Sequence, residues 1–511
     1  MSAAEHEHGE QSRRYGDIIR SMSVIGLSQL ISIGLSILRI KVLAVLLGPN
    51  GVGLFGLYNV ILDLGAGIAG MGVQSSGVRQ VAVSVAEGDS ARIAIVAQTI
   101  TRLSLLLGIV GAVLLFILSG PVSLLTFGDE ANAPAIGLLS AALFLRIIAG
   151  SPFAILQGNR RMGDLARMTV LGAVLNTIVA IVLVYFLGEA GVVWSLVAMA
   201  LTSWLAAIWY GRKVILPKIV LTVSSFSAET RMLLGLGFAF MASGILTAGA
   251  ALIIRVLIVQ HDGVEAAGNY QAAWALGGIY VGFILQAMGT DFYPRLSGLA
   301  EDHEAANRLV NEQARVSMLL AGPGLLATIA LSPIVITLFY SSAFADAVPV
   351  LRWLCLGMLL RVMAWPMGYL ILAKGKQAMF FWTEVAATTV HVGLAYFLVN
   401  TIGVAGAGIA FAGLYLWHGV LIAVLVGRLT GFVWSGENLQ LAGLLVLQTI
   451  VALGAAEFLS PLAGVLIGLG VTAVACWMSL GQLIRIIPQK WIPSLARPLV
   501  YRVLGHQPEA A

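Results

Sequence analysis

The sequence predicts an all-α, polytopic inner-membrane protein with about 14 transmembrane helices. Of its 511 residues, 59% are hydrophobic and only 10% are charged, whereas soluble domains carry about 25% charged residues. Apolar runs of about 20 residues, long enough to cross hydrocarbon, follow one another along the chain. Lys and Arg are concentrated in every second connection between these runs, which is typical of a multi-pass membrane protein.

The predicted spans are separated by short hydrophilic or glycine-rich connections. Gly48-Pro49-Asn50-Gly51, for example, is a turn signal between the first two runs. The first run lacks a cleavage signature, so we expect it to remain as a membrane helix. The expected spans are residues 22–47, 53–73, 93–119, 133–157, 166–187, 190–210, 233–259, 266–290, 315–340, 347–373, 378–400, 403–426, 439–458 and 460–484.

The distribution of basic residues predicts the orientation. The N-terminus and the even-numbered connections carry Lys or Arg, while the odd-numbered connections carry none and hold acids such as Asp129 and Glu189. Because basic connections stay in the cytoplasm, both termini are predicted to be cytoplasmic.

An internal repeat divides the chain. At an offset of about 212 residues, Gly51-Val52-x-x-x-Gly56-x-Tyr58 matches Gly263-Val264-x-x-x-Gly268-x-Tyr270, and Leu145-Arg146 later matches Leu360-Arg361. Six helices per repeat is an even number, so the two halves should share one orientation in the membrane. The predicted organisation is a cytoplasmic segment (1–21), an N-lobe (22–210), a linker (211–232), a C-lobe (233–426), two additional helices (427–484) and a cytoplasmic tail (485–511).

Basic side chains within the spans are the candidate binding residues. A guanidinium in hydrocarbon is costly, so such residues usually face a cavity, a partner or a substrate pathway. The planar fork of Arg donates paired hydrogen bonds to phosphate and keeps its charge. Arg146 and Arg361 lie near mid-span, where a cavity is favoured over snorkelling to the interface. The candidates for a cavity between the lobes that binds a phosphate-bearing head group are Arg39, Lys41, Arg146, Arg255 and Arg361.

Basic residues closer to the span ends have a second interpretation. For Arg39, Lys41, Arg255 and Arg352, snorkelling or internal pairing is as well supported as ligand binding. Arg102, in the inner half of the third span, is expected to snorkel towards the cytoplasm.

Two acids within the spans are candidates for coupling or charge compensation. An isolated carboxylate in hydrocarbon is neutralised unless it is paired. Asp63 is predicted either to take up a proton or cation or to be a counter-charge for Arg39 or Arg146, and the counter-charge is favoured. For Glu384 we favour a contact with Lys374 or Lys376 at the cytoplasmic end.

Aromatic residues after the outer turns are candidates for sugar contacts. Tyr58, Tyr270 and Trp274 can stack on sugar rings or pack structurally, and the sequence favours neither. Trp365 is expected to be an interfacial anchor, and His391 and His418 are expected to be core histidines.

The sequence lacks the motifs that several classes of function require. No nucleotide-binding loop, kinase motif, nucleophile elbow or zinc-protease motif occurs in the sequence, so the protein is not expected to be an enzyme. Cys355 and Cys476 lack metal-ligand spacing, and neither a cofactor nor a metal is expected. The net charge of +5 is explained by membrane orientation rather than by nucleic acid.

Three stretches resemble the Wzx-type flippases of O-antigen and other lipid-linked oligosaccharides. They are Arg39 to Gly53 (R-x-K-V-L-A-V-L-L-G-P-x-G-V-G), Phe292 to Ser297 (F-Y-P-R-L-S), and Leu351-Arg352 with Gly368 to Lys374 (G-Y-L-I-L-A-K). The likeness is nearest to the enterobacterial-common-antigen flippase type, within the multidrug/oligosaccharidyl-lipid/polysaccharide exporter superfamily. It implies two six-helix lobes around a central cavity, undecaprenyl-pyrophosphate-linked sugar as cargo, and important cations in that cavity.

Three functions compete. The favoured one is a flippase for surface polysaccharide synthesis (O-antigen, exopolysaccharide or common antigen), with a polysaccharide polymerase or chain-length machinery as expected partners. A cation-coupled multidrug exporter of the same superfamily would need acids rather than Arg in the spans. A membrane polymerase or ligase would need a long external loop, and every predicted external connection is short.

Overall fold

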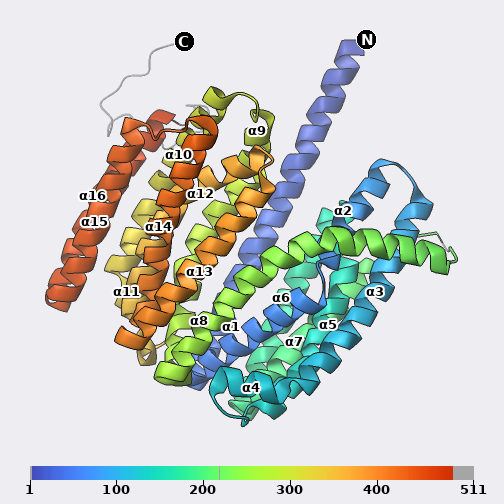
Figure 1. Cartoon of the computed structure of the whole chain (residues 1–511), viewed down its shortest axis with the longest axis horizontal. Coiled ribbons are helices and arrows are strands. Elements are labelled where there is room, and N and C mark those ends of the chain that lie inside the picture. Colours follow the sequence, from blue (N-terminus) through green and yellow to red (C-terminus); the bar gives the residue numbers. More distant parts are fainter. Residues whose placement is uncertain (1–2, 218, 487–511) are drawn as a thin grey trace. The chain divides into compact units, whose positions relative to one another are not determined.

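The computed structural model describes residues 3–217 and 219–486, but not the side chains of residues 1–25, 239, 287 and 290. Within this part the chain is all-α, as predicted (Figure 1). The predicted tail beyond residue 486 and the basic side chains of the predicted N-terminal segment lie outside the description. The α-helices are α1 (Ala3–Ala69), α2 (Val73–Ala86), α3 (Ser90–Ile117), α4 (Ser119–Phe127), α5 (Ala133–Gly158), α6 (Met162–Leu187), α7 (Ala190–Gly211), α8 (Val223–Ala287), α9 (Tyr293–Gly298), α10 (His303–Ala330), α11 (Ser332–Phe339), α12 (Ala347–Ala373), α13 (Gln377–Ile402), α14 (Ala405–Thr430), α15 (Gly436–Phe458) and α16 (Pro461–Ile486).

The described helices are long and apolar enough for a multi-pass membrane protein. Eleven can cross a membrane, or twelve if the bent pair α10 and α11 is one span. Two of the eleven cover 44 and 47 residues, about 66 and 70 Å at 1.5 Å per residue, twice the ~30 Å hydrocarbon thickness. Each is therefore long enough for two spans. Fourteen spans result only if both are counted double and the bent pair is also counted as one span, and that count stays a prediction.

Both double-length helices are kinked at a glycine with positive φ. Gly48 has φ 64° in α1, and Gly263 has φ 86° in α8. Glycine adopts this region at no steric cost, and Pro49 disfavours helical geometry at the residue before it. The sequence match had paired Gly51 with Gly263, so the first kink falls three residues before the matched glycine. Pro49, which has no equivalent after Gly263, explains the difference.

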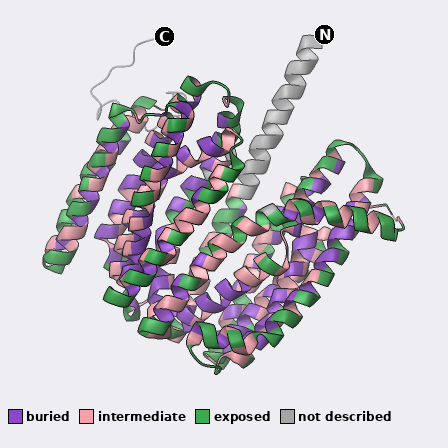
Figure 2. Ribbon diagram, viewed as in Figure 1, coloured by how far each residue is buried: buried purple, intermediate pink, exposed green. Residues whose placement is uncertain are grey.

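The chain forms two compact units. Unit 1 contains residues 1–268 and 339–343, and unit 2 contains residues 269–338 and 344–511. The predicted C-lobe begins at residue 233, whereas α8 belongs to unit 1 as far as Gly268. In both units the buried segments lie on the sides of helices that face their neighbours (Figure 2).

Corresponding elements of the two units have matching lengths. α3 and α10 are 28 residues each, and both begin after an aspartate cap: Asp89 accepts a hydrogen bond from the Arg92 backbone at 2.9 Å, and Asp302 accepts one from Ala305 at 3.0 Å. Such caps satisfy amides that have no partner within the helix. The helices α5, α6 and α7 recur in the same order as α12, α13 and α14, while α15 and α16 have no counterpart in unit 1.

Candidate functional site

Unit 1 holds an ion pair in the middle of its spans. Arg146, at the centre of α5, places Nη1 2.9 Å from Oδ1 of Asp63 in the second half of α1. The two side chains are 37% and 54% exposed. Because intramembrane charges avoid lipid and face cavities or partners, this pair marks a polar part of the surface of unit 1. Of the two interpretations of Asp63, the ion pair corresponds to the counter-charge.

Arg39, in the first half of α1, is only partly satisfied. Its Nη2 donates to the hydroxyl of Ser36 at 2.9 Å, one turn earlier. Its Nε is buried and has no hydrogen-bond partner among the described residues. Buried donors without a partner are rare in proteins, so Arg39 keeps one unsatisfied hydrogen-bond donor in this conformation.

Lys41 and Arg255 are held by the backbone of unit 1. The Lys41 ammonium donates to the carbonyl oxygen of Tyr340. Arg255 is 5% exposed, and its Nη1 donates to the carbonyl of Ala251 at 2.9 Å, one turn back along α8. In this conformation both residues have structural contacts, and their predicted role in binding remains a prediction.

Unit 2 places an aromatic cluster around Arg361 of α12. The guanidinium carbon lies 4.6 Å from the ring centroid of Trp365, one turn later, and 5.7 Å from that of Tyr415 on α14. The buried Nε of Arg361 has no hydrogen-bond partner in the described part of the chain. Cation–π contacts orient a guanidinium without neutralising its charge. Trp365 was predicted to be an interfacial anchor, and that role stays a prediction beside its contact with Arg361.

Glu384 of α13 also belongs to this cluster. Its charge interacts with that of Arg361 and with Tyr415, whereas Lys374 donates to the carbonyl of Ala300. The favoured contact of Glu384 with Lys374 or Lys376 is therefore not formed in the described part of the chain, and the charge of Glu384 acts on Arg361 without an ion pair. The charge of the same guanidinium also acts on the imidazole of His418 of α14.

The two units share one arrangement. Arg146 and Arg361 occupy matching positions on α5 and α12, and each has a carboxylate near it from another helix. The carboxylate comes from α1 in unit 1 and from α13 in unit 2, so the repeat preserves the arginine and not the position of its partner. Sequence matching identified both arginines. The i to i+4 spacing of Arg361 and Trp365 was a local signal for their contact, whereas the contact with Tyr415 depends on how α12 meets α14.

The predicted sugar contacts are mostly buried. Tyr58 is 2% exposed and donates to Oδ1 of Asn132 at 2.9 Å, and Tyr270 is 1% exposed. A buried ring has no free face for a sugar, so these two predictions do not hold in this conformation. Trp274 is half-buried, stacks on Tyr270 with centroids 6.0 Å apart and touches the edge of Phe411.

The described side chains offer no group of three or more His, Cys, Asp or Glu residues that could hold a metal ion. The chemistry of the site consists of cation, carboxylate and aromatic groups. Such groups can bind and release an anion.

Repeated helical units that keep paired arginines within membrane spans define a polytopic membrane transporter. The chain belongs to the polysaccharide biosynthesis protein family, which matches residues 42–349. Over 393 residues it is 23% identical to the lipid III flippase of Escherichia coli (strain K12), a match that covers 76% of this chain and 93% of the relative.

Solved structures share the fold. The lipid II flippase MurJ, in an inward closed conformation, superimposes with a TM-score of 0.68 and 14% identity, covering 90% of this chain and 99% of that chain. An inward-facing multidrug resistance MATE transporter of the MOP superfamily gives a TM-score of 0.67 at 18% identity, covering 78% and 94%. The predicted fold class is confirmed.

Proposed function

We propose that this protein is a flippase that moves undecaprenyl-pyrophosphate-linked oligosaccharides from the cytoplasmic to the outer face of the inner membrane, for synthesis of a surface polysaccharide such as O-antigen, exopolysaccharide or common antigen. The observation that carries the proposal is the pair of matched mid-span arginines, each accompanied by a carboxylate. The name of the E. coli relative, a lipid III flippase, supports it.

The ion pair suggests how cargo is held and released. A pyrophosphate carries more negative charge than one carboxylate and accepts paired hydrogen bonds from a guanidinium. It can therefore displace Asp63 from Arg146, after which the carboxylate regains its partner when the cargo leaves. At Arg361, the two aromatic rings keep the guanidinium in place for the same cargo.

Alternating access completes the proposed cycle. The cargo head group enters from the cytoplasm, the prenyl tail stays in lipid, and the two lobes rock about the bound head group. Both termini are cytoplasmic in this scheme, and a polymerase or chain-length protein receives the cargo. Asp63 or Glu384 can take up a proton when cargo displaces it, which would couple transport to a proton gradient.

A cation-coupled multidrug exporter is the second candidate, favoured by the likeness to the MATE fold. Its cationic cargo would be repelled by the arginine centres, and the mid-span acid Asp63 is already paired. We therefore propose that the cargo is an anion rather than a cation.

A complementation experiment tests the proposed cargo. In a strain that lacks the gene, Arg146→Gln and Arg361→Gln should each lower surface polysaccharide at least about tenfold, because a hydrogen bond to a charged group contributes about 1.5–3 kcal/mol. Arg167→Gln, at an arginine 72% exposed beside Asp164, is the matched control and should leave it unchanged. Wild-type polysaccharide in the Arg146/Arg361 double variant, at normal membrane levels, would refute the proposal.

A further inference from the structure

One side of α3 in unit 1 is exposed along most of the helix and has a charge at one end. Arg102 and the apolar residues that follow it at helical spacing are all exposed. Arg102 has no hydrogen bond or ion pair within the described part of the protein. We call this side the α3 face, and it consists of Arg102, Leu105, Leu106, Ile109, Val110, Val113, Leu114 and Ile117.

The corresponding side of α10 in unit 2 is covered. The shared length and aspartate caps align Ser90 with His303 and place Arg102 opposite Arg315 in the repeat. Each apolar position of the α3 face then has a counterpart on α10 that is buried or half-buried. These counterparts are Met318, Leu319, Gly322, Pro323, Leu326, Ala327 and Ala330.

The additional helices α15 and α16 cover α10. A methyl group added at Gly322 would lie 2.7 Å from Leu445 of α15, and one at Gly468 of α16 would lie 2.7 Å from Ala330. Contacts this close leave no room for lipid. The hairpin formed by α15 and α16 therefore packs tightly against α10 within unit 2.

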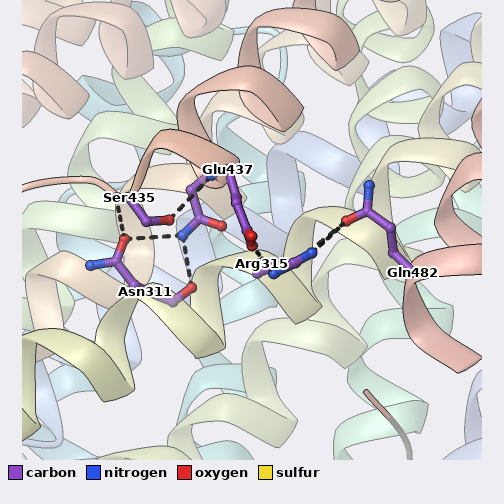
Figure 3. A network of polar contacts seen from close by, with 6 residues as sticks. Asn311, Arg315, Ser435, Glu437 and Gln482 are labelled. Atoms are coloured by element: carbon purple, nitrogen blue, oxygen red, sulfur yellow. Dashed lines mark hydrogen bonds and ion pairs between the residues drawn. The ribbon is translucent and has the colours of Figure 1, made fainter. Parts of the chain in front are cut away.

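Arg315 anchors that hairpin by its charge (Figure 3). Its guanidinium pairs with Glu437 of α15 and donates from Nη2 to Oε1 of Gln482 of α16 at 3.1 Å. One turn away, Asn311 accepts from the Ser435 backbone amide at 2.9 Å. In unit 2, the arginine at this position of the repeat thus binds a carboxylate on an added transmembrane helix.

A pocket lies at the other end of the α3 face, and the corresponding place in unit 2 is filled by a side chain. The pocket has a volume of about 490 Å³ and is lined by Phe116, Ser119 and Gly137 among others. The counterpart of Ser119 is Ser332, which accepts a hydrogen bond from Nε of Arg352 at 2.8 Å, and Arg352 also reaches the carbonyl of Ala456 in α15 at 3.4 Å. The alignment that pairs Arg146 with Arg361 pairs Gly137 with Arg352. Unit 1 therefore has a pocket where unit 2 has the side chain that holds α15.

We propose that the α3 face binds a transmembrane helix of another membrane protein, which presents a carboxylate to Arg102 and apolar side chains to the rest of the face. A guanidinium with no partner among apolar side chains is costly in a membrane, and a carboxylate would provide the partner that Glu437 provides for Arg315. Two copies of this chain meeting by their α3 faces would bring two arginines together. This inference does not depend on the cargo.

A photocrosslinking experiment tests the proposed partner. A benzophenone amino acid at Val110, 54% exposed in the middle of the α3 face, is introduced into the full chain in its native membrane. Irradiation should give a protein adduct whose linked peptide maps to a transmembrane helix with an Asp or Glu near one end. The same probe at Ile178, 54% exposed on α6, controls for random collisions and should not give this adduct.

Charge variants decide whether Arg102 makes the contact. Arg102→Glu should lower the adduct at least about tenfold, Arg102→Lys should largely retain it, and replacing the partner's carboxylate by Arg should restore it in Arg102→Glu. Membrane levels of each variant are compared by immunoblot. Adducts with lipid or a second copy only, no adduct, an adduct shared with Ile178, a linked helix without an acid, or no response to Arg102→Glu would each overturn the proposal.

Discussion

At the residue scale, both units place an arginine near a carboxylate. An anion with more negative charge can take the place of that carboxylate beside the guanidinium. Arg146 with Asp63, and Arg361 with Glu384, lie on different pairs of helices but combine the same charges. Removing the carboxylate of Asp63 would leave the guanidinium of Arg146 without its counter-charge.

Outside the spans, the acid Glu229 near the start of α8 makes a pH-dependent contribution. Burial raises the pKa of its carboxyl group, while the nearby Arg92 partly opposes this shift. Its Oε2 is buried with no partner in the described structure. A carboxyl group with a raised folded-state pKa favours folding while it is protonated, and this contribution is lost as pH rises through that pKa.

Glu229→Gln should therefore flatten the dependence of stability on pH. Between about pH 4 and pH 7, the unfolding temperature in detergent should rise relative to wild type by a few degrees at most, because the amide carries no charge to bury. Glu87→Gln is the control, since Glu87 lies 3.6 Å from the same Arg92 but is half-exposed. A wild-type pH profile in Glu229→Gln, or an equal change in Glu87→Gln, would contradict this assignment.

At the element scale, the kinks of α1 and α8 meet within unit 1 through their backbones. A methyl group added at Gly268 would lie 1.9 Å from the carbonyl oxygen of Pro49, and one at Gly53 would lie 2.2 Å from that of Val264. Only glycine allows such an approach at these positions. Gly53 and Gly268 thus allow the two turns to pack backbone against backbone. Gly48 and Gly263 bend the two helices.

Gly268→Ala should destabilise the protein by about 1–3 kcal/mol or more, the range for overpacking a dense contact. The measurement is thermal unfolding of the purified protein in detergent. Gly282→Ala, later on α8, is the matched control because nothing lies within 4 Å of its added methyl group, so it should be neutral or slightly stabilising. Equal melting temperatures for the two variants would refute the backbone contact.

Elements were more predictable than contacts. Apolar runs and the repeat located the helices, and the matched Arg146 and Arg361 followed from the same comparison. The predicted turn at residues 48–51 contains the kink at Gly48, whereas the repeat alignment pointed to Gly51, because Pro49 acts locally and independently of the repeat. The neighbours of Glu384, and the burial of Tyr58, depend on which helix faces meet, which single-sequence spacing does not encode.

At the scale of the whole molecule, the two units of the repeat differ in what covers their corresponding helices. Unit 2 has its α10 covered by α15 and α16, while no described helix covers the α3 face of unit 1 in this way. The matched arginines Arg146 and Arg361 are nevertheless present in both units. We infer that transport depends on what the units share and partner binding on what distinguishes them.

Transport of a pyrophosphate-linked sugar in a purified system tests this account most directly. Proteoliposomes that contain only this protein should move a fluorescent undecaprenyl-pyrophosphate oligosaccharide between leaflets without elongating it, measured by its accessibility to an external quencher. The Arg146→Gln/Arg361→Gln double variant should be at least about tenfold slower, since each lost charged hydrogen bond is worth about 1.5–3 kcal/mol. Equal rates for the two proteins, or no movement by wild type, would contradict the central claim.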